Sequence, residues 1–201
     1  MKYAIIGSGN IGAALARAFA QKNIEVAIAN SRGPETLASL TKELGPSVLP
    51  RSVQDAAEAE MIFLAVPFPA HKDVAKQIGS WQGKIIVDAT NAFGVTPQDL
   101  GGMLSSEVVS QAFAGARVVK AFNHLPAKQL GTNPSVEGQQ QAVFVSSDDA
   151  EASAAVASVV TQIGFAPVEL GKLAQGGAAL HVVNGQPGGL LFQNLVKIDE
   201  Q

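Results

Sequence analysis

Short apolar runs alternate with segments of helical period along the first part of the chain. The runs are nearly continuous in Ile, Val, Leu and Ala, which is typical of strands covered on both faces of a sheet. They predict strands at Tyr3–Ile6, Glu25–Ala29, Met61–Val66, Lys84–Asp88 and Arg117–Phe122, and a weaker strand at Ser47–Pro50. The segments between them predict helices at Gly12–Lys22, Pro34–Leu44, Val53–Glu58 and Ala70–Ile78. This alternation favours a doubly wound, mostly parallel sheet with right-handed crossovers.

The pattern changes after Leu125. Two more apolar runs predict strands at Ala142–Ser146 and Ala166–Leu170, and the segment between them opens with capping residues and predicts a helix. From Gly171 the chain is rich in glycine and then apolar, which predicts a loop followed by a short helix. We therefore expect a single compact domain, with a core over residues 1–125 and a short α/β C-terminal extension over residues 126–201.

The first predicted strand is followed by a glycine-rich turn, "GSGNIG", which has the spacing G-x-G-x-x-G at Gly7, Gly9 and Gly12. Gly7 permits a tight turn, Gly9 lets the backbone approach a pyrophosphate, and Gly12 lets the helix pack close to the sheet. The pyrophosphate would then face free N–H groups at the positive end of a helix dipole. Because strand, turn, helix and next strand all have suitable lengths, the core is predicted to be a Rossmann-type dinucleotide-binding unit. The alternative is a nucleotide fold that has lost its ligand.

The second predicted strand ends in "ANSRG", where a protein that binds NAD usually carries an acid for the adenine ribose. Here Asn30 is neutral, Ser31 can donate through its hydroxyl, and Arg32 can fork onto phosphate oxygens. The stretch therefore predicts a site for the 2′-phosphate and a preference for NADP(H). The alternative for Arg32 is a solvated turn residue before Gly33.

Two later strand ends are expected to line the rest of the cofactor, since ligands of open α/β sheets bind beyond the carboxyl ends of strands. Ala65, Val66 and Pro67 follow one apolar run and would pack against the adenosine or pyrophosphate. Asn91 follows another and would bond the nicotinamide ribose. An ordinary strand-to-loop turn remains the alternative at both places.

Composition narrows the classes of function. The 201 residues are 47% hydrophobic and 15% charged, which suits one globular domain. A net charge of −3 without a Lys/Arg run gives no electrostatic footprint for nucleic acid or an anionic membrane. The absence of cysteine excludes disulfides, thiolate metal sites and thiol nucleophiles. No metal site is expected. Gly7–Asn10 interrupts the first apolar run, so we expect a cytoplasmic protein without a signal peptide.

Few groups are available for acid–base chemistry. Tyr3 lies in the first strand, and Lys120 lies in a strand-end segment that should face the nicotinamide. The histidines are His71, which is expected to begin a helix, His124 and His181. No nucleophile triad or carboxylate pair is visible. Hydride transfer between nicotinamide and a flavin-like ring depends mainly on ring positioning, so it is compatible with this set.

The segments "YAIIGSGNIGAALARAF", "ANSRGPETL", "FLAVPF", "IIVDATNAF" and "VVKAFNHL" occur in the order found in a known family. The chain resembles the NADP-dependent reductases of the deazaflavin-coenzyme oxidoreductase family, to which the reductase domain of the six-transmembrane metalloreductases is related. The later "AVFVSSDDAEA", "GFAPVELGKL" and "GQPGGLLFQNLVK" are similar to that family too, so the resemblance extends over nearly the whole chain.

The resemblance implies hydride transfer between NADP(H) and a deazaflavin, flavin, quinone or related acceptor. Further residue roles follow from it, and they are implied only by the family. Ser8, Gly9, Asn10 and Ile11 would cradle the pyrophosphate, Ala121, Phe122 and Asn123 would back the nicotinamide, and the acceptor ring would stack from the Gly171–Gly189 side.

Three features depart from the family pattern. One is the "GKLAQGG" segment of mostly small and neutral residues, which is expected to offer no partner to an anionic tail of the acceptor. Glu35 and Thr36 stand where members often carry a further basic residue, which implies weaker binding of the 2′-phosphate. His124 replaces a small hydroxyl residue, and it either contacts the acceptor or is a satisfied polar residue at a strand end.

Other readings of the same residues stay open. A non-catalytic NADPH sensor would have the same cofactor site, and an imine or keto-acid reductase would share the glycine loop and the arginine. The expected partner is a small redox molecule, with no nucleic acid or membrane. The apolar "GGLLFQNLVKI" and the helix near Ala152–Val160 are core or interface, and the resemblance favours a homodimer.

Overall fold

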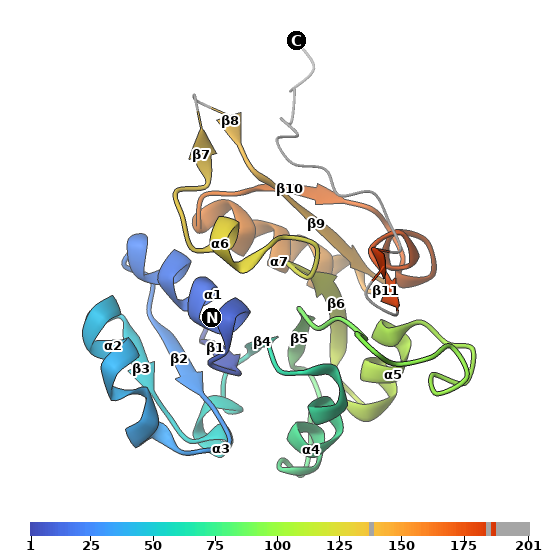
Figure 1. The fold of residues 1–201 in the computed structure, drawn as a ribbon, viewed down its shortest axis with the longest axis horizontal. Coiled ribbons are helices and arrows are strands. Elements are labelled where there is room, and N and C mark those ends of the chain that lie inside the picture. Colours follow the sequence, from blue (N-terminus) through green and yellow to red (C-terminus); the bar gives the residue numbers. More distant parts are fainter. Residues whose placement is uncertain (137–138, 184–185, 188–201) are drawn as a thin grey trace.

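The computed structural model describes residues 1–136, 139–183 and 186–187 (Figure 1). The strands of the main sheet are β1 (Tyr3–Ile6), β2 (Val26–Ala29), β3 (Val48–Pro50), β4 (Met61–Leu64), β5 (Ile85–Asp88), β6 (Arg117–Ala121), β9 (Ala142–Ser147) and β10 (Ala166–Glu169). The helices and helical turns are α1 (Asn10–Gln21), η1 (Pro34–Leu37), α2 (Ala38–Leu44), α3 (Val53–Ala56), η2 (Phe68–Ala70), α4 (His71–Lys76), α5 (Ser105–Ala112), α6 (Ala127–Leu130), α7 (Ala150–Gln162) and η3 (Leu173–Gly177). Two small hairpins pair β7 (Ser135–Val136) with β8 (Gln139–Gln140), and β11 (Val182–Val183) with β12 (Gln186–Pro187).

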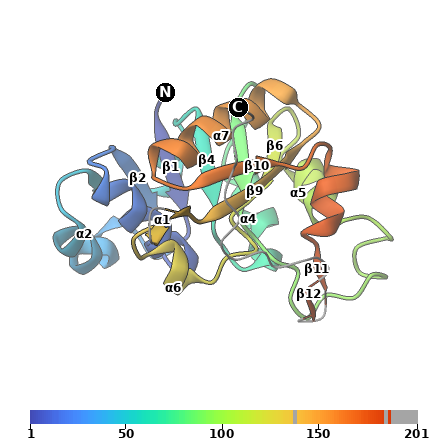
Figure 2. The ribbon, with the colours of Figure 1, turned by 90° about the horizontal axis from the view of Figure 1, so that it is seen from above.

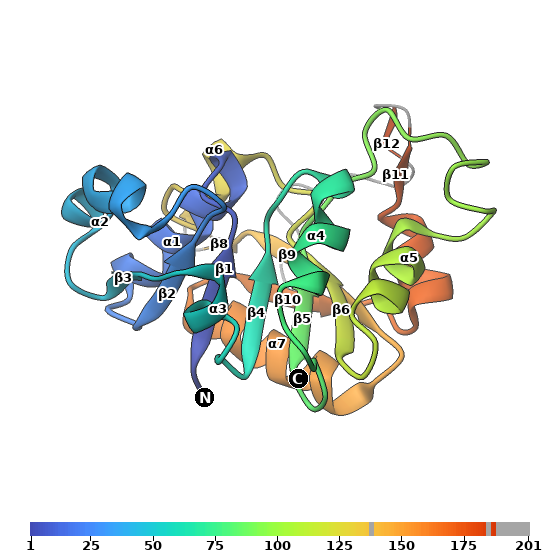
Figure 3. The ribbon, with the colours of Figure 1, turned by 90° about the horizontal axis from the view of Figure 1, so that it is seen from below.

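The main sheet has the strand order β10-β9-β6-β5-β4-β1-β2-β3. Figure 3 shows the six strands from β3 to β6 side by side. These six are parallel to one another, and β9 joins β6 in the antiparallel sense. The predicted Rossmann-type, mostly parallel sheet is therefore confirmed. Its topological switch point lies between β1 and β4, so ligands are expected beyond the carboxyl ends of these strands.

Helices cover both faces of the sheet, each over its own apolar cluster. On one face Phe19 of α1 and Val156 of α7 are buried against the strands. On the other face Phe113, next to α5, packs against Trp81, and Val74 of α4 joins the same cluster. Figure 1 shows α4 and α5 on one side of the strands and α7 on the other, and Figure 2 shows α6 beside α1. Within the described residues, no helix is long and apolar enough to cross a membrane.

The expected elements appear with boundary shifts of one to a few residues, including the weak strand at β3 and the start of α4 at His71. Several features are not predicted by the pattern, among them the hairpin of β7 and β8. The segment before β6 forms α5, a short α6 follows β6, and the expected loop after Gly171 contains the turn η3. The short helix expected after that loop, and the apolar "GGLLFQNLVKI", lie outside the described residues.

Candidate functional site

The glycine loop joins β1 to α1 at the switch point of the sheet. Gly7 has φ +113°, and a Cβ atom there would lie 2.2 Å from the Ala65 carbonyl oxygen. A Cβ on Gly12 would lie 1.8 Å from the Gly7 carbonyl oxygen, so only glycine permits this approach. Gly9 has open space where its Cβ would stand. The two outer glycines therefore shape the loop, and the middle one leaves room for a ligand.

The first turn of α1 offers hydrogen-bond donors to that space. Gly9 caps the helix without a side chain, and the exposed Asn10 follows it. Among the described residues, the backbone N–H groups of Asn10, Ile11 and Gly12 have no acceptor. Ile11 packs its partly buried side chain against the core below. Free donors at the positive end of a helix favour an anion such as a pyrophosphate.

Asn30 connects the glycine loop to the turn after β2. Its Nδ2 donates to Ser8 Oγ at 2.9 Å and to Thr36 Oγ1 at 3.1 Å. Its Oδ1 accepts from the Arg32 N–H at 2.9 Å, which closes an Asx-type turn. Asn30 therefore fixes the backbone on which Ser31 and Arg32 stand, and its own side chain is engaged in this role.

Ser31 and Arg32 are both exposed at the tip of this turn. In the described part of the chain, Arg32 forms no ion pair, so its guanidinium is available to a phosphate. A Cβ on Gly33, which has φ +97°, would lie 2.4 Å from Glu35 Oε1. The carboxylate of Glu35 therefore lies over the same turn and opposes an anion bound there.

The loop after β4 passes beside the glycine loop. Ala65 donates its N–H to the Ile6 carbonyl at 2.8 Å and is half-buried, as is Val66, whereas Pro67 is exposed. These residues border the space beyond β1 and β4, where the sequence places them.

Two asparagines form a pair at the carboxyl ends of β5 and β6. Asn91 Nδ2 donates to the Asn123 carbonyl at 2.8 Å, and Asn123 Nδ2 donates to Asn91 Oδ1 at 2.9 Å. Asn123 Nδ2 also donates to the Leu180 carbonyl at 2.8 Å. The pair therefore ties the C-terminal extension to the edge of the sheet where the nicotinamide is expected.

Ala121 and Phe122 present no side chain at this edge, because both are 0% exposed. The Phe122 ring packs edge-on against Phe63 in the core, with ring centroids 5.8 Å apart. Its φ of +66° is unusual for a residue with a side chain, and it turns the backbone so that Asn123 meets Asn91. These two residues can reach a cofactor only through their backbone.

Lys120 does not offer a free ammonium group to the nicotinamide. The side chain is 1% exposed, and its Nζ donates to Asp88 Oδ2 at 2.9 Å and to the Thr90 carbonyl at 2.5 Å. Asp88 Oδ1 accepts from the N–H and the hydroxyl of Thr90 at 2.9 and 2.7 Å. The ion pair therefore holds the ends of β5 and β6 together beneath the site.

Tyr3 lies away from the carboxyl ends of the strands, and His124 is buried. Tyr3 begins β1, so it lies at the opposite edge of the sheet, where burial and then Glu60 raise the pKa of its phenol. The His124 ring stacks on Phe144 at 4.8 Å between centroids, and its Nε2 accepts from the Phe144 N–H at 3.4 Å. Burial lowers the pKa of His124 to about 4. The ring is therefore buried and its Nε2 has a partner, whereas its Nδ1 has none among the described residues, so the choice between an acceptor contact and a satisfied polar residue stays a prediction.

One residue pair that the sequence does not assign lies beside the asparagines. His181 follows Leu180, and its Nδ1 lies 3.1 Å from Ser105 Oγ at the start of α5. The two residues are 76 positions apart, so no local pattern predicts their contact. Of the signals in the sequence, only the helix-capping composition of "LSSE" marks Ser105 as a helix start.

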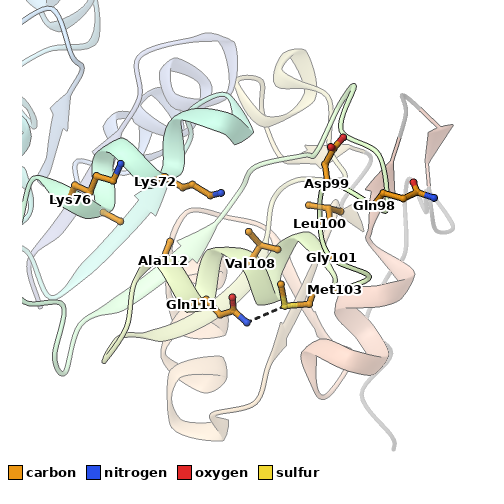
Figure 4. A pocket seen from close by; sticks show the side chains of 11 residues that line it. Lys72, Lys76, Gln98, Asp99, Leu100, Gly101, Met103, Val108, Gln111 and Ala112 are labelled. Carbon is orange, nitrogen blue, oxygen red and sulfur yellow. Dashed lines mark hydrogen bonds between the residues drawn. The ribbon is translucent and has the colours of Figure 1, made fainter.

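A groove of about 580 Å³ lies elsewhere, between α4, α5 and the loop at residues 98–103. Figure 4 shows Lys72 and Lys76 on one side of it and Met103 and Gln111 on the other. None of the residues that the sequence assigns to the cofactor lines this groove, so it is separate from the site at the strand ends.

Comparison with solved structures supports the same fold over most of the chain. A hypothetical protein of Sinorhizobium meliloti is 43% identical, with a TM-score of 0.90, over 98% of this chain and 96% of that one. A protein of Arthrobacter sp. FB24, whose proposed role is F420-dependent NADP reductase, is 27% identical, with a TM-score of 0.72, over 87% of this chain and 86% of its own.

Comparison of sequences adds a curated relative and a family. Metalloreductase STEAP3 of Rattus norvegicus is 31% identical over 176 residues, which are 86% of this chain and 34% of that protein, so the chain spans about a third of its length. Residues 2–92 match the family model described as NADP oxidoreductase, coenzyme F420-dependent. Residues 2–92 of the chain therefore match this family of NADP-dependent oxidoreductases, and the relatives named above are similar to most of the chain.

Proposed function

We propose that this protein transfers hydride between NADPH and a flat, conjugated acceptor of the deazaflavin, flavin or quinone type. The observation that carries the proposal is the enclosure of Lys120 by Asp88 and Thr90. Among the described residues, this enclosure leaves the ends of β5 and β6 lined mainly by amides, with no free lysine ammonium to drive addition to a carbonyl or imine. Ring-to-ring hydride transfer asks the protein chiefly to align two rings.

The cofactor side of the proposal rests on the two loops that Asn30 joins. The unpaired N–H groups of α1 suit a pyrophosphate, and the exposed Arg32 suits a 2′-phosphate. No acid stands at the end of β2 itself, since Asn30 occupies the place where NAD-binding proteins carry one. NADPH is therefore the hydride carrier we propose, and Ser8, Gly9, Asn10, Ile11, Ser31 and Arg32 are its proposed phosphate contacts.

The test is transfer of deuterium from NADPH labelled at nicotinamide C4. The purified protein is incubated with a deazaflavin, a flavin, a quinone, a cyclic imine and a keto acid, and NADPH oxidation is followed by absorbance. We expect turnover with at least one of the ring acceptors, a primary isotope effect, and deuterium retained at C5 of a reduced deazaflavin where that acceptor is used.

Other outcomes would identify the competing functions. Turnover confined to the imine or the keto acid would replace the proposal by an imine or keto-acid reductase. Tight NADPH binding without turnover of any acceptor would favour a redox sensor. Because the chain is similar to a metalloreductase, ferric complexes are also tested as acceptors. Turnover with ferric complexes alone would contradict direct hydride transfer to an organic ring.

A further inference from the structure

His181 lies where the acceptor is expected, at the edge of the asparagine pair. The carbonyl of its neighbour Leu180 accepts a hydrogen bond from Asn123, which is paired in turn with Asn91. The His181 side chain is half-buried, whereas Lys120 is fully enclosed nearby. Among the described residues, His181 is therefore the ionisable side chain at this edge that keeps access to a bound molecule.

The contacts of His181 fix which ring nitrogen carries the proton. The Ser105 N–H lies 3.5 Å from His181 Nδ1, and a backbone N–H can only donate. The Ser105 hydroxyl lies 3.1 Å from the same nitrogen and can donate as well. Nδ1 is therefore the acceptor, and in the neutral ring the proton is on Nε2.

The surroundings of the ring keep it neutral near pH 7. Burial lowers the pKa of His181, the positive charge of Lys120 lowers it further, and the negative charge of Glu107 acts in the opposite direction. The N-terminus of α5, which Nδ1 faces, also disfavours a second proton. His181 therefore presents a neutral Nε2–H, with no acceptor among the described residues.

We propose that His181 binds the hydride acceptor by donating its Nε2–H to a carbonyl oxygen or ring nitrogen conjugated with the carbon or nitrogen atom that receives the hydride. This inference rests on the proposed function. The hydride brings two electrons to the acceptor ring, NADPH becomes NADP⁺, and negative charge develops on the conjugated heteroatom. A hydrogen bond from His181 stabilises that charge, and the proton that completes the reduction comes from water.

The neutral Nε2–H group of His181 indicates which class of acceptor it can bind. A neutral imidazole N–H suits a polar carbonyl or imine nitrogen of a quinone, flavin or deazaflavin ring and would be a poor partner for a ferric ion, which binds unprotonated nitrogen. The Ser105 contact serves as the positioning element, because it orients the ring and sets its tautomer.

The experiment compares His181→Phe and His181→Gln with Gln162→Ala, an exposed control at the end of α7, outside the segment from which the acceptor is expected to stack. For the acceptor that the wild type uses best, we expect His181→Phe to lower kcat/KM by about 10- to 100-fold, the range for a lost hydrogen bond to developing charge. Glutamine retains an N–H donor and should recover most of the rate, and the control should match the wild type. The Kd of NADPH should be unchanged in all three.

A second readout does not depend on turnover. Nitrogen NMR of the labelled imidazole should show the Nε2–H tautomer of His181 at pH 7, and Ser105→Ala should shift the ring toward a mixture of tautomers. If His181→Phe keeps the wild-type kcat/KM, or if the NMR spectrum shows the Nδ1–H tautomer, this inference is wrong and the proposed function still stands. Absence of turnover and of acceptor binding in the wild type would instead overturn both.

Discussion

The ammonium group of Lys120 lies 2.9 Å from Asp88 Oδ2, and neither side chain is more than 1% exposed. The pair joins neighbouring strands β5 and β6 at their carboxyl ends, and the Thr90 carbonyl completes the lysine's surroundings. Removing either charge would leave the other buried without a partner, which would lower the free energy of unfolding. The floor of the site therefore depends on an ion pair that is itself closed to ligands.

Lys120→Met should destabilise the protein strongly, because it leaves Asp88 buried without its counter-charge. We expect the free energy of unfolding to fall by about 3–5 kcal/mol, measured by urea denaturation. Lys76→Met is the matched control, since Lys76 and Asp73 are 79% and 81% exposed and 3.8 Å apart, and it should cost less than about 1 kcal/mol. If the two variants lose similar amounts of unfolding free energy, the buried ion pair contributes no more to stability than the exposed one.

Alanine in the glycine loop should separate folding from cofactor binding. Gly9→Ala meets no atom within 4 Å, and the φ of −73° suits alanine, so stability should stay near that of the wild type. The new methyl group stands where the pyrophosphate is expected, so the Kd of NADPH should rise at least about tenfold.

Gly12→Ala should instead harm the fold, because its Cβ would overlap the Gly7 carbonyl oxygen. We expect a loss of about 1–3 kcal/mol in the free energy of unfolding, even without cofactor present. Calorimetry and fluorescence titration of both glycine variants check these outcomes. Equal NADPH affinity in Gly9→Ala and the wild type would place the pyrophosphate elsewhere.

Arg32 and Glu35 should have opposite effects on the choice of cofactor. Arg32→Ala removes a charge-assisted contact to the 2′-phosphate, so we expect the Kd of NADPH to rise by about 10- to 100-fold and that of NADH to change little. Glu35→Gln removes the carboxylate that lies over the same turn, so it should tighten NADPH binding selectively. If Arg32→Ala keeps the wild-type ratio of the two constants, the arginine is a solvated turn residue.

His124 should make stability depend on pH in the acidic range. In the unfolded chain its imidazole takes up a proton below pH 6.5, whereas in the folded protein burial delays this to about pH 4. The unfolded state therefore binds more protons between these values, so stability falls as the pH falls from 6.5 to 4, and this contribution levels off below. The loss amounts to about 3 kcal/mol.

The measurement is the free energy of unfolding of the wild type and His124→Gln from pH 8 to pH 4. The value at pH 8 gives the packing cost of the substitution, and the difference that develops below pH 6.5 gives the histidine's proton linkage. The variant should lose less stability on acidification than the wild type. Parallel curves would mean that the ring is protonated as readily in the folded protein as in the unfolded chain.

Much of the fold is readable from the sequence because its signals are local. Apolar runs that are covered on both faces predicted the parallel strands. The spacing of Gly7, Gly9 and Gly12 predicted a turn in which the positive φ of Gly7 and the close contact of Gly12 with the Gly7 carbonyl both require glycine. The helix α5 escaped prediction because its eight residues make only about two turns, which is too short for a helical period to be distinguished from a loop. Elements of that length are stabilised mainly by what they pack against.

The sequence by itself determined the strand–helix alternation, the glycine loop and the absence of an acid after β2, since each depends on a few consecutive residues. Only the tertiary structure decided what the polar side chains do there. It paired Asn30 with Ser8, enclosed Lys120 with Asp88, and brought His181 to Ser105. The reason is physical: these contacts join residues 22, 32 and 76 positions apart, and burial and hydrogen-bond direction exist only once the strands have assembled.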